Sequence, residues 1–174
     1  RKEEAVPIFE RIVAEHTNGR YGPQSQFTLG DYYYGLKEYG KATASYEHFL
    51  ELFTTEQLQG RDKQLVNKAV TLLGHLAEID AYNLYAQGEV LFDQKKYDEA
   101  VEIFKQVQVK YPESDQAVNA MVNIGAAFMA QEEYRQAGAV FQEVVDKYSD
   151  NDKYLAQVDF SKQQLEVMQE ARVL

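Results

Sequence analysis

Small and aromatic residues recur along this chain at a fixed spacing, and this spacing constrains the fold more than any other feature. Alanines stand 37, 58 and 37 residues apart, at Ala5, Ala42, Ala100 and Ala137. An aromatic residue follows each alanine by four positions, at Phe9, Tyr46, Phe104 and Phe141. A bulky apolar residue follows three positions later, at Ile12, Phe49, Val107 and Val144. A chain that repeats at such a period is expected to stack similar structural units.

Three further positions repeat ahead of the last three alanines. A tyrosine precedes each by three residues, at Tyr39, Tyr97 and Tyr134. A glycine precedes each by twelve residues, at Gly30, Gly88 and Gly125. Apolar residues recur at helical spacing around these positions, and the chain has only three prolines. We therefore expect an all-α protein of antiparallel helix pairs, in which the glycine of the first helix and the alanine of the second permit close packing.

The spacing of 58 residues exceeds one period by 21 residues and needs its own explanation. From Leu65 an apolar stripe runs through Ala69, Leu76 and Leu84 to Leu91, and no proline interrupts it. Helices alternate between two layers in a repeat stack, and one separate extra helix would break that alternation. A single long helix from about Gln64 to Phe92 preserves it and is the favoured interpretation. A break near Asp80 is the alternative.

These patterns predict a single repeat array over residues 1–174. Residues 1–18 form the second helix of a truncated repeat, and 55–80 form an insertion or the N-terminal part of the long helix. Complete repeats are expected at residues 23–54, 81–112 and 114–149. Residues 151–173 are expected to form a capping helix, whose polar outer face closes the stack. Only four residues precede Ala5, so we expect the chain to be part of a longer protein with further repeats upstream.

The repeated positions resemble the tetratricopeptide repeat motif. Its glycine, tyrosine, alanine, aromatic residue and proline correspond to Gly88, Tyr97, Ala100, Phe104 and Pro112. The resemblance covers nearly the whole chain and implies a right-handed α-α superhelix, also called a solenoid. Two departures occur: the period of 37 is longer than the usual ~34 residues, and the proline position holds Thr17, Thr54 or Ser149 in the other copies.

The longer period and the Tyr-Pro-x-Ser ending at 111–114 are similar to the repeats of bacterial envelope proteins. Examples are the lipoprotein of the outer-membrane β-barrel assembly machine and the periplasmic coordinator of the Tol system. This likeness implies a bacterial protein and favours the periplasm or cell envelope over the cytoplasm.

Composition and motifs give no support for catalysis. The net charge of -10 and a pI near 4.8 argue against a nucleic-acid surface, and the chain has no cysteine. The segment 35–43 is similar to a phosphate-binding loop, but Ala42 stands where a Ser or Thr would reach magnesium. The three histidines are far apart in sequence. We therefore expect no enzyme, no cofactor and no metal site.

The resemblance implies where a partner binds, because the first helices of tetratricopeptide repeats line a concave groove. The predicted groove residues are Phe27, Asp31, Tyr34, Tyr82, Tyr85, Glu89, Phe92, Val122, Asn123 and Met129. Aromatic stripes at helical spacing also pack between helices, so a core role for the aromatic members is the alternative.

The favoured function is a non-enzymatic scaffold that binds a peptide or a partner helix in this groove. Family members that hold a C-terminal carboxylate do so with Lys and Asn, whereas the corresponding positions here are largely aromatic or acidic. We therefore expect a protein or peptide ligand with apolar anchors and basic flanks. The alternative is a structural module that mediates homo-oligomerisation, and a third reading is part of an enzyme whose catalytic domain lies outside this sequence.

Overall fold

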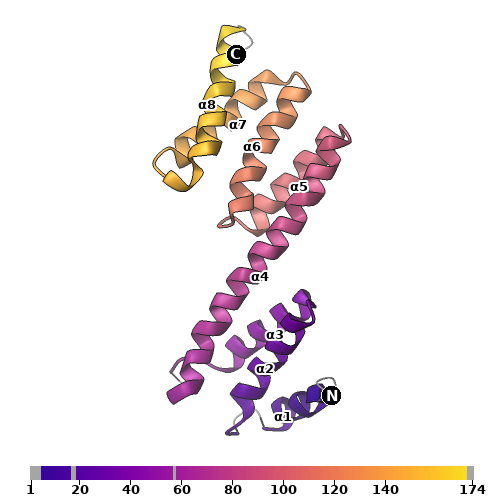
Figure 1. Cartoon of the computed structure of the whole chain (residues 1–174), viewed down its shortest axis with the longest axis vertical. Helices are drawn as coiled ribbons and strands as arrows, with labels where there is room; N and C mark the ends of the chain where they lie inside the picture. Colours follow the sequence, from indigo (N-terminus) through magenta and orange to yellow (C-terminus); the bar gives the residue numbers. More distant parts are fainter. Residues whose placement is uncertain (1–4, 17–18, 57, 172–174) are drawn as a thin grey trace. The chain divides into compact units, whose positions relative to one another are not determined.

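The protein is all-α in the three ranges that the computed structural model describes, residues 5–16, 19–56 and 58–171 (Figure 1). Its elements in chain order are α1 (Val6–His16), α2 (Gly22–Gly35), α3 (Tyr39–Leu52), α4 (Gly60–Asp93), α5 (Tyr97–Lys110), α6 (Asp115–Ala130), α7 (Tyr134–Tyr148), the short 3-10 helix η2 (Asp152–Tyr154) and α8 (Leu155–Glu170). No strand occurs in the described ranges. The predicted fold class, an all-α repeat solenoid, is confirmed.

The chain divides into two compact units, which we describe separately. Unit 1 is Arg1–Leu76 and contains α1, α2, α3 and the first half of α4. Unit 2 is Ala77–Leu174 and contains the second half of α4 and the helices that follow. Each unit has its own apolar core. A single continuous array over the whole chain stays a prediction.

The repeat glycines admit an aromatic ring of the second helix of each pair. A Cβ atom placed on Gly30 would lie 2.4 Å from the Tyr46 ring, and one on Gly125 would lie 2.7 Å from the Phe141 ring. The corresponding distance from Gly88 to the Phe104 ring is 2.5 Å. All three rings are fully buried. The glycine is therefore required for the ring that packs on it, more than for contact between the two backbones.

The turn inside each helix pair has the same backbone conformation three times. Lys37, Lys95 and Glu132 have φ angles of 61°, 60° and 62°, in the left-handed region. In each turn the next residue donates its N–H to a carbonyl five residues earlier, as from Lys96 to Leu91. These bonds close the end of the first helix. A left-handed residue at this point reverses the chain so that the second helix runs back along the first.

Helix α4 is continuous from Gly60 to Asp93 and 34 residues long (Figure 1). The favoured long helix is confirmed, and there is no break near Asp80. Its first half contributes Ala69 and Leu76 to the core of unit 1, and its second half packs against Phe104 in unit 2. One helix therefore serves as a first helix in both units.

Helix α8 packs against α7 and covers the end of unit 2. Its buried apolar side chains, Val158 and Met168, join clusters that contain Val144 and Phe141. Its exposed side includes Asp159, Lys162 and Glu166. A capping helix is thus confirmed. Within the described ranges, no helix combines the length and the apolar character that crossing a membrane requires.

Candidate functional site

In unit 1, the predicted groove residue Phe27 belongs to the core. Its side chain is only 3% exposed, and its ring lies 5.3 Å from that of Tyr46 and 5.6 Å from that of Phe49. The ammonium group of Lys68 lies over the ring at 4.7 Å from its centroid. The position three residues before Gly30 therefore faces helix α3, and Phe27 offers no surface to a partner.

Asp31, the predicted groove carboxylate of unit 1, contacts two other side chains of the same unit. Its Oδ1 accepts a hydrogen bond of 2.7 Å from the hydroxyl of Tyr46, and its Oδ2 lies 3.3 Å from Nζ of Lys68. Burial, and then the Asp31 carboxylate, raise the pKa of the Tyr46 hydroxyl well above its usual value. Tyr34 is half-buried, with its ring 5.9 Å from that of Tyr39. These contacts tie α2 to α3 and α4.

In unit 2, two predicted residues from different helices meet directly. Nδ2 of Asn123 on α6 donates a hydrogen bond of 2.8 Å to the hydroxyl of Tyr85 on α4. The ring of Tyr85 lies 5.5 Å from the ring of Phe104, and the side chain is half-buried. Burial, followed by the carboxylate of Glu89, raises the pKa of the Tyr85 hydroxyl well above its usual value. The phenol is therefore neutral and fixed in place.

Around this pair, the predicted residues differ in how much surface they offer. Tyr82 is 59% exposed, and Glu89 is also exposed. Phe92 is half-buried, with its ring 5.2 Å from the ring of Tyr97. The remaining two predicted residues are Val122 and Met129. Both are half-buried and pack against the core cluster that contains Phe141. Tyr82 is thus the one exposed aromatic side chain of the predicted set.

Hydrogen bonds between successive first helices recur at a separation of 38 residues, which sequence reasoning missed. The set comprises Gln24 to Asp62 at 3.1 Å, Asn123 to Tyr85 at 2.8 Å, and Gln157 to Asn119 at 2.8 Å. One period plus one residue places these side chains at corresponding points of neighbouring helices. The repeat spacing contains the signal for these bonds, but only Tyr85 and Asn123 among these residues belong to the predicted groove, where they are expected to meet a partner.

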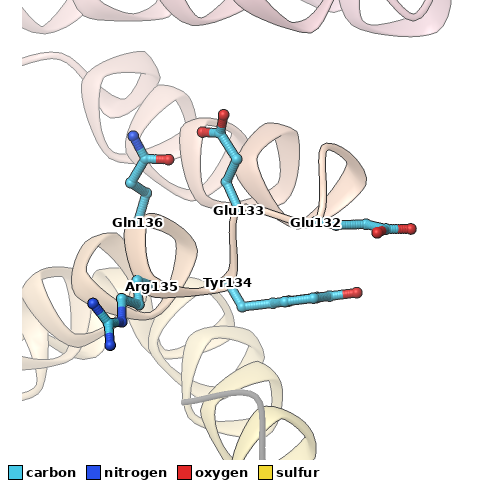
Figure 2. A pocket seen from close by; sticks show the side chains of 5 residues that line it. All are labelled: Glu132, Glu133, Tyr134, Arg135 and Gln136. Atoms are coloured by element: carbon cyan, nitrogen blue, oxygen red, sulfur yellow. The ribbon is translucent and has the colours of Figure 1, made fainter.

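An open hollow of about 490 Å³ lies at the turn between α6 and α7. Its lining side chains diverge from the turn instead of converging on one point (Figure 2), and they are Glu132, Glu133, Tyr134, Arg135 and Gln136. None of them belongs to the predicted groove. Within the described ranges, no three His, Cys, Asp or Glu side chains are arranged to hold a metal ion.

The antiparallel helix pairs, with a glycine under each aromatic ring, define a helical repeat protein. Models of the tetratricopeptide repeat match residues 23–54 and 85–152, which together make up more than half of the 174 residues. The chain therefore belongs to the tetratricopeptide repeat family, whose repeats mediate protein–protein interactions and are not catalytic. No curated protein sequence matches the chain. Neither family match supports the narrower likeness to bacterial envelope proteins.

Proposed function

We propose that the chain is a non-enzymatic scaffold that binds a peptide or a partner helix on the face of unit 2 formed by α4 and α6. One observation carries this proposal: Tyr82 is 59% exposed and lies on the same helix as Glu89 and the fixed Tyr85. Tyrosine is enriched at the energetic centres of protein interfaces, because its ring buries a large area at little entropic cost. Half-buried Asn123 and Met129 extend the face onto α6.

Charge supports a partner with basic flanks. Residues 1–76 contain 9 basic and 10 acidic residues, whereas residues 77–174 contain 9 basic and 18 acidic residues. Unit 2 therefore carries a net -9 of the total of -10. A basic segment approaching unit 2 is attracted over about 8 to 10 Å at physiological salt. Apolar anchors on the partner would cover Tyr82 and the half-buried side chains beside it.

The site within unit 2 is tested by photo-crosslinking. A photoreactive amino acid replaces Tyr82, and a control chain carries it instead at Val109, which is 81% exposed on α5. We expect position 82 to capture a protein that position 109 does not. The partner, once identified by mass spectrometry, is purified and titrated against the wild-type chain.

Matched variants then test the residues. Tyr82→Ala and Glu89→Gln change exposed side chains, so they leave the fold intact, and each is expected to weaken binding about 5-fold to 30-fold. Val109→Ala is the control and should bind as the wild type does. If both Tyr82→Ala and Glu89→Gln bound the partner with unchanged affinity, or if positions 82 and 109 crosslinked equally, the proposed binding face would be wrong.

A further inference from the structure

In unit 1, a lysine side chain lies between an aromatic ring and a carboxylate. The ammonium group of Lys68 on α4 lies 4.7 Å from the centroid of the Phe27 ring and 3.3 Å from Oδ2 of Asp31, and both of these residues are on α2. An aromatic face and a carboxylate each attract an ammonium group, and here they do so together. The side chains of Lys68 and Asp31 are 55% and 43% exposed, so unit 1 contains a lysine site at its surface.

Unit 2 repeats the ring and the carboxylate of this site but not the lysine. The ring and the carboxylate stand three residues before and one residue after the repeat glycine, and in unit 2 these positions are Tyr85 and Glu89. Lys68 stands 37 residues, or one period, after the carboxylate of unit 1. The residue one period after Glu89 is Ala126 on α6, which is half-buried. Unit 2 therefore has two parts of the lysine site, and its own sequence does not supply the cation at this position.

Successive first helices pack in the same register in both units, so these positions are equivalent. In each unit a hydrogen bond joins two residues that stand 38 positions apart on neighbouring first helices. These bonds are Gln24 to Asp62 in unit 1 and Asn123 to Tyr85 in unit 2. The helix that carries Lys68 and the helix that carries Ala126 therefore lie in corresponding places beside the ring and the carboxylate.

The residues around Glu89 carry negative charge without a compensating cation. Asp93 stands one turn after Glu89 at the C-terminal end of α4, where the helix dipole is also negative, and the last turn of α4 has no basic residue. Residues 77–93 and α6 together contain five acidic residues and no lysine, arginine or histidine. Among the residues that the structure describes, no cation forms an ion pair with Glu89 or Asp93. The carboxylate of Glu89, which is exposed, is thus available to a cation of another molecule.

We propose that the Tyr85 ring and the Glu89 carboxylate bind the ammonium group of a lysine side chain of the partner, beside Ala126. This inference rests on the scaffold function proposed above and specifies the chemistry of the partner at the same face. Lysine is favoured over arginine because the corresponding site in unit 1 holds a lysine, and because one carboxylate suits a point charge better than a planar guanidinium. The side chain of Ala126 ends at Cβ, so it leaves the space that a lysine at this position would occupy.

The site is tested first without the partner, by use of amino-TEMPO, a nitroxide that carries a primary ammonium group. In the ¹⁵N-labelled chain a nitroxide broadens the amide resonances near the place where it binds, and neutral hydroxy-TEMPO gives the background. We expect the cationic nitroxide to broaden residues 85–89 and 123–126 more than the neutral one does. Glu89→Gln should reduce this excess about 2-fold to 5-fold. The control Glu143→Gln, which changes an exposed carboxylate on α7, should leave it unchanged.

A lysine supplied by the chain itself tests the comparison between the two units. Ala126→Lys introduces the residue that unit 1 has at this position, and Ala126→Gln is a control that adds a long side chain without charge. Ala126→Lys should reduce both the excess broadening and the crosslinking of the partner from position 82 by about 5-fold or more. Ala126→Gln should reduce neither by more than about 2-fold.

Three results would overturn the proposal. They are equal broadening by the two nitroxides, an unchanged excess in Glu89→Gln, and equal effects of the lysine and glutamine substitutions at position 126. Failure of the scaffold function is a different result, because it is the absence of any protein captured from position 82. The nitroxide comparison requires no partner, so it decides the lysine site in either case.

Discussion

Two glycines in α4 offer a direct comparison of what the repeat glycine does. A Cβ atom on Gly88 would lie 2.5 Å, 2.7 Å and 3.0 Å from three atoms of the Phe104 ring. That ring is fully buried, and protein cores are close-packed, so moving it is costly. A Cβ atom on Gly74, fourteen residues earlier in the same helix, would meet nothing within 4 Å. Alanine is therefore sterically harmless at one position and overpacked at the other.

The expected changes in the free energy of unfolding follow from these distances. Alanine favours a helix interior over glycine by about 1 kcal/mol, so Gly74→Ala should stabilise the protein by about 0.5 to 1 kcal/mol. Overpacking a core costs about 1 to 3 kcal/mol, which exceeds or cancels that gain in Gly88→Ala. We expect the two variants to differ by about 1 to 3 kcal/mol, with Gly88→Ala the less stable.

Urea unfolding followed by circular dichroism at 222 nm measures both free energies, and unchanged m-values show that the unfolding transition is comparable. Hydrogen exchange of amides in α5 provides a local measure beside Phe104. If Gly88→Ala stabilised the protein as much as Gly74→Ala, glycine would not be required under the ring. The account of the helix pairs would then be wrong.

Four further outcomes are expected. Gly125→Leu should overpack against Phe141 and lower the free energy of unfolding by about 1 to 3 kcal/mol in the same urea assay. Lys95→Gly should raise it by about 0.5 to 1 kcal/mol, because a left-handed backbone strains a residue with a Cβ atom. Tyr85→Phe should lower it by about 0.5 to 1.5 kcal/mol, since Asn123 loses its acceptor. The hydrogen bond from Lys153 lowers the pKa of the Asp115 carboxyl below its ordinary value of 3.8. The ionised carboxylate therefore contributes fully to the free energy of unfolding above pH 3.8, and this contribution is lost as the pH falls through the lower pKa of the folded state. Urea titrations from pH 6 to pH 2 should therefore show a smaller loss of stability in Asp115→Asn.

Much of the fold could be predicted because it depends on small residues at fixed spacing. The glycines, alanines and aromatic residues of each pair stand in register, and the apolar stripe of α4 continues without proline, so the pairs and the long helix followed directly. The left-handed turn residues could not be predicted, because lysine and glutamate carry no preference for that conformation. Their backbone angles are set by the tertiary structure, because the second helix of each pair must run back along the first.

The candidate site was harder to predict, because exposure depends on neighbours that periodicity does not specify. Phe27 and Tyr85 occupy corresponding positions, yet Phe27 is in the core and Tyr85 is half-buried. A phenylalanine has no polar end and is fully covered, whereas the hydroxyl of Tyr85 needs a partner and finds it in Asn123. Asp31, which is predicted to meet a ligand, is exposed, and its carboxylate also accepts a hydrogen bond from the hydroxyl of Tyr46, which replaces the phenylalanine of the other repeats.

The scaffold function is tested most directly by hydrogen exchange of the chain with and without the partner that position 82 captures. We predict slowed exchange in residues 81–93 of α4 and in α6, which form the proposed face of unit 2, with little change in the exposed turns of α5 and α7. Slowed exchange confined to α5 and α7, or no difference anywhere in unit 2, would contradict the proposal that this face binds the partner.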